Sequence, residues 1–529
     1  MRLKLAPRTS AAPSDLWLWL GPLIYMLIVG LYFIVRYGGR WAEVDSAIFT
    51  EVIRVFAREG RLVPTGGELY PNGYGYQAIS AFVLTFTGLD AATLQQLIYP
   101  LLAAPITLTA FALFRELTGS RRGALIATML LFTQPEFLFV ILRSSHEKFT
   151  RTLLLLCMFW LARSLRLRER PWLFATHVGL FYLTAYTLIA SNNLLAHSFI
   201  FAIVVALLLG WALGRVSRHL RAAGEDLPRR LAYATLVSLG LVYLFTFYAY
   251  QPAQHDLQIL HDVWERIAAL FLDVETRSSN AYAYVALGWI SLPVYFMVSI
   301  ANWIVLAASF AIWLAQAWRW LWRRAAPPSA AAWLLWLFYA GFAAQGALSA
   351  VVDASGSLGG NIQHRLFPSF SILACGLVGA QLAQWRPQRL RGPIRLALSV
   401  GIGCVAALST LKATNEPLLS NKWTFYQTAE LEALRWTDAH LHSADIWSEV
   451  DERLQMAFLM RVGASANRNL FYGAAEVETA TRHLIVTSVS RLRNSRLHNP
   501  LPVPSDALRI YDNGDAQLYH VRPRTPYQR

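Results

Sequence analysis

The stretch RWAEVDSAIFTEVIRVFAREGRLVPTGGELYPNGYGY, residues 40–76, lies between the first long apolar segment of the chain and all the later ones. It is polar, acidic and aromatic, and Glu43 and Asp45 stand one residue apart near its start. From Asp45 to Glu59, apolar residues recur at helical spacing among charged ones, which predicts an amphipathic helix on a membrane surface. Gly60 ends that helix. We expect the chemistry of the protein to take place in this loop.

The composition predicts a multi-pass membrane protein. Of the 529 residues, 55% are hydrophobic and only 15% are charged, and several apolar runs are long enough to cross a bilayer. The first run, residues 16–37, is too long for the core of a signal peptide and is followed by no small-residue cleavage pattern. We therefore expect it to remain as a helix.

The net charge of +15 is explained by topology and gives no reason to expect a nucleic-acid partner. Most arginines gather in short loops, and such clusters mark the cytoplasmic side of a membrane. They place the N-terminus in the cytoplasm and residues 38–73 outside. The three cysteines all fall inside predicted helices, which leaves no disulfide framework and no cysteine-based metal site.

The same charge pattern predicts about eleven transmembrane helices. Residues 74–89 would reverse the side of every later arginine cluster if they crossed, so we expect them to form a second surface helix at the outer face. The predicted crossings lie at about 16–37, 92–114, 124–142, 152–165, 171–190, 194–212, 231–250, within 281–320, and at 330–350, 366–384 and 394–411.

The composition changes at Lys412, after which no apolar run reaches membrane length. TAELEALRWTDAHL has the pattern of a helix, LIVTSV and LRIYD that of strands, and NGD that of a hairpin turn. The sequence therefore predicts a mainly α membrane domain, residues 1–411, and a small α/β exterior domain, residues 412–529.

Glu43 and Asp45 are the first candidates for a functional role. A carboxylate at the outer face can accept a proton from a hydroxyl or hold a divalent cation. The alternative for Asp45 is structural, since an aspartate before an amphipathic helix caps its free N–H groups.

Glu147 is the second acidic candidate. It lies between His146 and Lys148 in a short polar loop, residues 143–151, that is flanked by predicted helices. Ionisable groups in such places are functional candidates. The alternative is local pairing of Glu147 with Lys148 or Arg151 at the start of a helix.

His364 and Arg365 offer cations just before the predicted 366–384 helix, where an arginine could hold a phosphate with two hydrogen bonds. The alternative is a side chain that extends to lipid headgroups. Most aromatic residues would form an interfacial belt. Those beside the acidic loop could stack on a sugar ring: Tyr70, Tyr74 and Tyr76.

The order and sidedness of these motifs resemble the GT-C superfamily of integral-membrane glycosyltransferases, such as the dolichyl-phosphate-mannose-protein mannosyltransferases and the aminoarabinose transferases. The matching features are Glu43–Val44–Asp45, the helix after it, Tyr70–Pro71, the basic turn in ALFRELTGSRRGALIATMLLF, Glu147, and His364–Arg365–Leu366–Phe367–Pro368. They cover the chain up to about residue 385. No WWDxG sequence is present, so the oligosaccharyltransferase branch is not expected.

The resemblance implies an inverting transfer of a hexosyl or pentosyl group from a polyprenyl-phosphate donor to an acceptor hydroxyl at the outer face of the plasma membrane. Asp45 would be the base with Glu43 beside it, and Glu147 would assist; Asp45 and Glu147 could bind Mg or Mn. Arg365 and His364 would hold the donor phosphate. The substrate-lining residues would be His146, Lys148, Tyr70, Tyr74 and Tyr76. The acceptor could be a glycan, a lipid or a protein.

Two other functions fit part of the pattern. A transporter or flippase of lipid-linked glycans would also have many helices, but it would show paired repeats and charges at the membrane midplane. A non-catalytic subunit of a polysaccharide assembly system would use its exterior domain to bind a partner. A transferase predicts that Glu43, Asp45, Glu147 and Arg365 converge at one outer site, whereas a transporter predicts a polar path through the bilayer.

Overall fold

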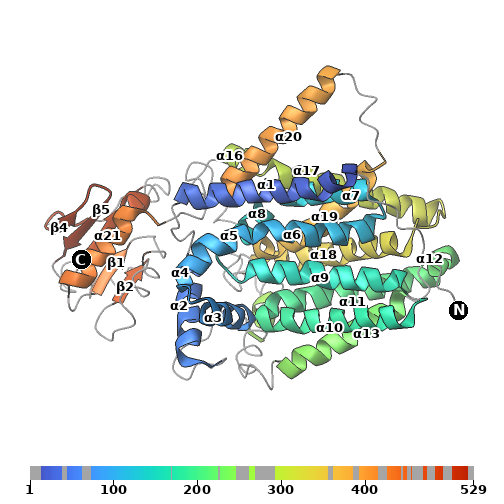
Figure 1. The fold of residues 1–529 in the computed structure, drawn as a ribbon, viewed down its shortest axis with the longest axis horizontal. Coiled ribbons are helices and arrows are strands. Elements are labelled where there is room, and N and C mark those ends of the chain that lie inside the picture. Colours follow the sequence, from blue (N-terminus) through green and yellow to red (C-terminus); the bar gives the residue numbers. More distant parts are fainter. Residues whose placement is uncertain are drawn as a thin grey trace.

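The computed structural model describes residues 13–37, 44–61, 73–167, 169–223, 227–245, 261–268, 292–355, 362–384, 392–414, 426–441, 445–448, 454, 469–472, 483–491 and 503–521. Long helices run side by side in a bundle, and a small sheet with one helix lies beyond one end of it (Figure 1). The helices α2 (Val44–Glu59), α3 (Gly75–Thr87) and α4 (Ala91–Thr93) lie at that same end (Figure 1).

The described residues contain seven helices that are long and apolar enough to cross a membrane, and nine spans if each of two bent helix pairs counts as one. The prediction of a multi-pass membrane protein is confirmed, but the count of eleven crossings is not. The seven are in α1 (Pro13–Tyr37), α10 (Pro171–Ser191), α11 (Asn193–Val216), α17 with η4 (Ile300–Ala317, Trp318–Trp322), α18 (Ala330–Ala354), α19 (Ile362–Leu382) and α20 (Gly392–Ala413).

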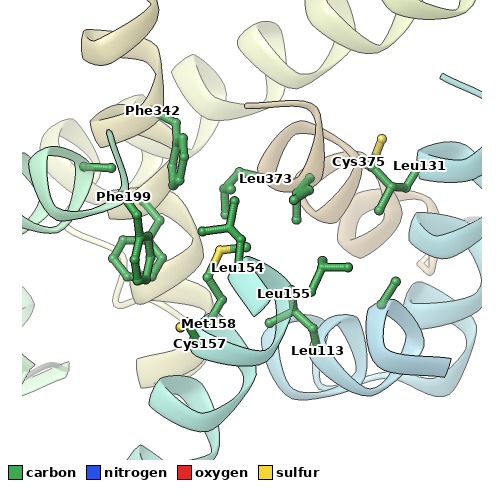
Figure 2. Packing of buried hydrophobic residues seen from close by; sticks show 14 of the residues in the cluster. Leu113, Leu131, Leu154, Leu155, Cys157, Met158, Phe199, Phe342, Leu373 and Cys375 are labelled. Atoms are coloured by element: carbon green, nitrogen blue, oxygen red, sulfur yellow. The ribbon is translucent and has the colours of Figure 1, made fainter. Parts of the chain in front are cut away.

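The remaining helices link these spans or pack against them. They are α6 (Ala103–Thr118), α7 (Arg121–Phe132), α8 (Pro135–Leu142), α9 (Glu147–Arg166), α12 (Arg218–Ala223), α13 (Leu227–Leu244) and α16 (Leu292–Val298). The centre of α9 packs in the apolar core together with α6, α7, α11, α18 and α19. Figure 2 shows this packing, with Leu154, Leu155 and Met158 of α9 facing Leu113, Leu373 and Phe342.

The first loop contains the two helices that the sequence predicts. In α2 (Val44–Glu59), Phe49, Ile53 and Phe56 are buried, as expected for an amphipathic helix. The second is α3 (Gly75–Thr87), which packs on α2 and meets residues 91–101 at an angle of 118°.

Two predicted crossings are broken in the structure. Instead of one helix over 92–114, the chain forms α4 (Ala91–Thr93), η1 (Leu94–Ile98), α5 (Tyr99–Leu101) and then α6. Instead of one helix over 124–142, α7 and α8 meet at 74°. Proline explains both breaks, because Pro100 and Pro135 lack an N–H group for the preceding turn and are accommodated best at a helix start.

Two helices begin earlier than predicted. Helix α9 starts at Glu147, so the polar loop before it is shorter than residues 143–151. Helix α19 starts at Ile362, so His364 and Arg365 lie inside it and not before it. The carboxylate of Asp353, at the end of α18, accepts the N–H groups of Ile362 and Gln363, both at 2.8 Å. A cap supplied by a different helix leaves no local sequence signal.

The chain after the last span forms α21 (Thr428–His440) and a five-stranded sheet in the order β2-β1-β3-β5-β4. Strands β2, β1 and β3 are parallel, and β5 is antiparallel to β3 and β4. The predicted helix, strands and NGD hairpin are all present. The strands are β1 (Asp445–Ser448), β2 (Asn469–Tyr472), β3 (His483–Thr487), β4 (Leu508–Asp512) and β5 (Ala516–His520).

Candidate functional site

The segment RSSHEKFTR, residues 143–151, connects α8 to α9 and is the centre of the candidate site; we call it the buried polar turn. Although it holds three cations and one carboxylate, its charged side chains are all buried, from 1% exposed for Arg151 to 7% for Glu147. Buried charge is costly unless it is paired or hydrogen-bonded. Each charged group of the turn therefore requires a partner.

Glu147 pairs with Arg143, one helical turn before it, through Oε2 and a guanidinium nitrogen. The alternative of an ion pair between Glu147 and Lys148 is not what the structure has. Lys148 instead donates from its ammonium group to the main-chain carbonyl of Tyr99, and the ammonium lies 5.5 Å from the Tyr99 ring.

Arg151 joins the buried polar turn to α19. One guanidinium nitrogen donates to Ser369 Oγ, and the other donates to the main-chain carbonyl of Arg365 at 2.6 Å. The arginine therefore brings Glu147 and Arg365, two residues predicted to act together, to one end of the bundle. The side chain of Arg365 is itself exposed.

His364 takes part in a second charged cluster. Its Nε2 lies 3.5 Å from Glu136 Oε2, while Lys412 donates to Glu136 Oε1 at 2.5 Å and to Ser299 Oγ at 2.6 Å. The cluster ties α8 to α19 and to the last turn of α20. Sequence reasoning missed Glu136 and Lys412, although an acidic residue within the apolar run PEFLFVIL is a signal that could have found the first.

The first loop packs directly on the buried polar turn. The ring of Phe49, in α2, lies 4.9 Å from the ring of His146 and 5.3 Å from that of Tyr76. Asp45 is the second residue of α2, one turn before Phe49. The main chain of α2 therefore places the predicted base one turn away from a residue that contacts the turn.

The predicted sugar-stacking tyrosines lie in different surroundings. Tyr76 is fully buried among aromatic rings, and its hydroxyl donates to Gln95 Oε1. The half-buried Tyr74 lies with its ring 5.5 Å from that of Phe245. Tyr70 and Glu43 lie outside the described residues, and the side chain of Asp45 does too.

A second loop contact holds the end of the site together. Gly73 has a φ of +122°, and a Cβ there would lie 2.4 Å from the carbonyl oxygen of Ala190. The N–H of Tyr74 donates to that same carbonyl at 2.9 Å. A Cβ on Gly75 would lie 2.4 Å from Ser191 Oγ. Residues 73–75 thus lie directly on the turn between α10 and α11, where only glycine allows so close an approach.

The described charged groups of the site suit an anion. Lys148 and Arg151 donate to neutral oxygens, and α9 begins here with the positive end of its dipole. Oε2 of Glu147 faces the guanidinium of Arg143. Within the described part of the chain, no three histidine, cysteine, aspartate or glutamate residues form a group that could hold a metal.

Comparison with known proteins identifies the fold. No family model matches the chain, and no curated protein matches it by sequence. Solved structures do match. The oligosaccharyltransferase of Archaeoglobus fulgidus, tethered with an acceptor peptide that contains the NVT sequon, matches with a TM-score of 0.52 and 11% identity, over 92% of this chain and 71% of that one.

A second match extends over almost all of both chains. ArnT from Cupriavidus metallidurans, solved bound to undecaprenyl phosphate, matches with a TM-score of 0.50 and 13% identity, over 96% of this chain and 98% of ArnT. Both matched proteins have the GT-C fold. The expectation of that fold is confirmed.

Proposed function

We propose that this chain, which has the GT-C fold of membrane glycosyltransferases, transfers a sugar from a polyprenyl-phosphate donor to an acceptor hydroxyl. The reaction would take place at the end of the bundle where α2 meets the buried polar turn. The observation that carries the proposal is the pair of buried cations, Lys148 and Arg151, whose hydrogen bonds go to neutral oxygens.

Lys148 and Arg151 donate their hydrogen bonds to neutral oxygens, with Glu147 the described carboxylate whose charge acts on Arg151, and this excess of buried positive charge favours an anionic ligand. The charge of an ammonium or guanidinium group is expensive to bury, and a bound phosphate would offset that cost. An arginine can also hold a phosphate in a planar, two-point arrangement. A phosphate-linked donor therefore suits the charge of this turn, and in the matched ArnT structure the bound lipid is undecaprenyl phosphate.

The proposed chemistry is a single inverting displacement. Asp45, with Glu43 beside it, would accept the proton of the acceptor hydroxyl as its oxygen bonds to the anomeric carbon of the donor sugar. The bond from that carbon to the phosphate oxygen breaks, and its electron pair leaves with the polyprenyl phosphate. Cations near the leaving group stabilise the charge that develops there. Arg365 and His364 would supply that stabilisation with Lys148 and Arg151.

The remaining assignments follow from this reaction. Glu147 would orient Arg143 and the start of α9, with His146 and the tyrosines of the first loop lining the substrate. Asp45 and Glu147 would hold Mg or Mn. Residues 1–411 would form the catalytic domain and residues 412–529 an exterior domain, with the N-terminus in the cytoplasm and the protein in the plasma membrane.

A direct assay tests the proposal. Purified protein in detergent is incubated with radiolabelled polyprenyl-phosphate sugars, with Mg, with Mn and with a chelator, and release of sugar is followed. Wild type is compared with Asp45→Asn and with Asp506→Asn, an exposed aspartate before β4 that serves as the matched control. We expect one donor to be turned over by wild type and the control, and not by Asp45→Asn.

Three possible results would each decide one part of the proposal: the base, the metal or the transferase activity itself. Full turnover by Asp45→Asn rules out the assigned base. Loss of turnover with the chelator assigns a metal. Absence of donor binding and turnover in every condition overturns the transferase assignment and favours a transporter or an assembly subunit.

A further inference from the structure

Asn192 lies between α10 and α11 and is 7% exposed. Its Oδ1 accepts the N–H of Leu195 at 2.9 Å, which makes Asn192 the N-cap of α11. Asparagine is among the preferred residues at this position because its side-chain oxygen satisfies a free N–H group of the first turn. This cap fixes which way the amide is turned.

The other end of the amide reaches the buried polar turn. Asn192 Nδ2 lies 2.6 Å from Nε2 of His146. An amide nitrogen carries two hydrogens and can only donate, so Nε2 of His146 must accept. A neutral imidazole that accepts at Nε2 carries its proton on Nδ1. The doubly protonated ring does not fit, because it would point one N–H group at another.

The main chain around Asn192 is itself held in place. The carbonyl of Ala190 accepts the N–H of Tyr74, and Gly73 and Gly75 allow the first loop to lie against Ala190 and Ser191. Phe49 covers the ring of His146 from the side of α2. Three loops that are far apart in the sequence therefore determine the position of this imidazole.

We propose that Asn192 is a positioning residue that holds His146 as the neutral, Nδ1-protonated ring. The inference rests on the proposed function, in which His146 lines the substrate site beside Glu147. A neutral ring adds no further cation to a turn that already holds Arg143, Lys148 and Arg151, and its orientation is fixed.

Two substitutions separate this role from capping. Aspartate and serine are both good N-caps, so Asn192→Asp and Asn192→Ser retain the start of α11. Aspartate replaces the amide donor with an acceptor, which requires a proton on Nε2 of His146. Serine caps the helix but is too short to reach the ring as well. Both variants should keep the thermal unfolding temperature of wild type within a few degrees.

The readout is the nitrogen spectrum of the ring. Protein labelled with 15N-histidine is reconstituted in nanodiscs, and His146 is assigned by the signal that His146→Gln lacks. We expect an unprotonated Nε2 in wild type, a protonated Nε2 in Asn192→Asp and a mixture of tautomers in Asn192→Ser. A protonated Nε2 in wild type, or an unchanged ring signal in Asn192→Asp, would overturn the inference.

The activity assay then separates the two proposals. If wild type turns over a donor, both variants should do so about tenfold or more slowly, with KM changed less than kcat. Equal turnover by wild type and both variants would remove the positioning role even though transfer is real. If no donor is turned over at all, the proposed function fails, while the tautomer of His146 is still decided by the spectrum.

Discussion

The guanidinium group of Arg151 donates to the main-chain carbonyl of Arg365 at 2.6 Å, across 214 residues of sequence. The contact joins the first turns of α9 and α19, which carry the acidic and basic residues that the sequence singles out. Because the same guanidinium also donates to Ser369, its position is fixed from two sides. Arg151 is therefore both a structural link and one of the three buried cations of the buried polar turn.

Replacement of Arg151 by lysine should separate its charge from its geometry. An ammonium group retains the positive charge but lacks the fixed fork of donors that allows one side chain to bond Ser369 and Arg365 together. We expect sugar release to fall at least about tenfold, from the loss of a placed cation near the leaving group. The measurement is kcat/KM with the donor that wild type turns over in the assay described under Proposed function.

The matched control is Arg122→Lys, because Arg122 is exposed in the first turn of α7. That variant should retain wild-type turnover and the wild-type unfolding temperature. Equal rates for Arg151→Lys and wild type would show that charge alone suffices at this position. Equal losses in both variants would point to a general effect of replacing arginine.

The ion pair of Glu136 and Lys412 lies outside the buried polar turn, but it should contribute strongly to the stability of the fold. Both side chains are about nine-tenths buried, at 11% and 10% exposed. Breaking a buried pair from one side leaves a charge without a partner and costs roughly 3–5 kcal/mol. We expect Glu136→Gln and Lys412→Met each to unfold at a clearly lower temperature than wild type.

The double variant Glu136→Gln, Lys412→Met is the decisive comparison, since it removes both charges together. It should recover most of the stability lost in either single variant, because neither the buried carboxylate nor the buried ammonium remains and His364, which also faces Glu136, is 44% exposed to solvent. If the stability loss of the double variant equals the sum of the losses of the two single variants, Glu136 and Lys412 do not act as a pair.

Much of this architecture could be predicted from periodicity and charge. The amphipathic α2, the helix α3, most of the apolar spans and the NGD hairpin all have local signals, which is why they are confirmed. The breaks at Pro100 and Pro135 are missed because the apolar pattern continues through both prolines. A prediction from that pattern gives one continuous helix, although each proline lacks the N–H group that a continuous helix needs.

The side-chain contacts of the site could not be predicted from the sequence for a different reason. Glu147 stands out in the sequence as a candidate, but its partner Arg143 does not. Lys412, which pairs with Glu136, gives no signal either, because the two are 276 residues apart. Asn192 gives no local signal of its contact with His146, because that contact depends on how distant parts of the chain meet. A side chain that acts through tertiary contacts gives no periodic or local pattern to detect.

Asp90 should give a small, pH-dependent contribution to stability. Partial burial raises the pKa of Asp90, but the hydrogen bonds from Arg54 and from the N–H of Ala92 outweigh burial and hold this pKa below its usual value. A carboxylate whose pKa is lower in the folded state stabilises the fold above its unfolded pKa of about 3.9. That stability is lost as the pH falls through the folded pKa.

An asparagine at this position would still cap α4, so Asp90→Asn removes only the ion pair with Arg54. The pair is exposed, with Asp90 at 55%, and is therefore expected to contribute at most about 1 kcal/mol. Thermal unfolding at pH 7 should show the variant slightly less stable than wild type, and the difference should shrink as the pH falls below about 4 and vanish below the folded pKa of Asp90. A difference that stays constant over this range would show that the ion pair is not its source.

Gly73 should tolerate no side chain, because two independent constraints meet at this residue. Its φ of +122° is one that residues with a Cβ rarely adopt, and the added atom would lie 2.4 Å from the main-chain oxygen of Ala190. The backbone conformation alone costs about 1–3 kcal/mol for a residue other than glycine. Gly73→Ala should therefore lower the unfolding temperature and release the first loop from the turn that holds Asn192.

Gly179 provides the matched control within α10. Nothing lies within 4 Å of a Cβ at this position, and its φ is not positive. In the middle of a helix, Gly179→Ala should stabilise by roughly 0.5–1 kcal/mol. Protease sensitivity of residues 62–72, compared between the two variants by mass spectrometry, reports on the loop itself. If both variants unfold and are cleaved like wild type, the close approach of Gly73 to Ala190 does not hold the first loop in place.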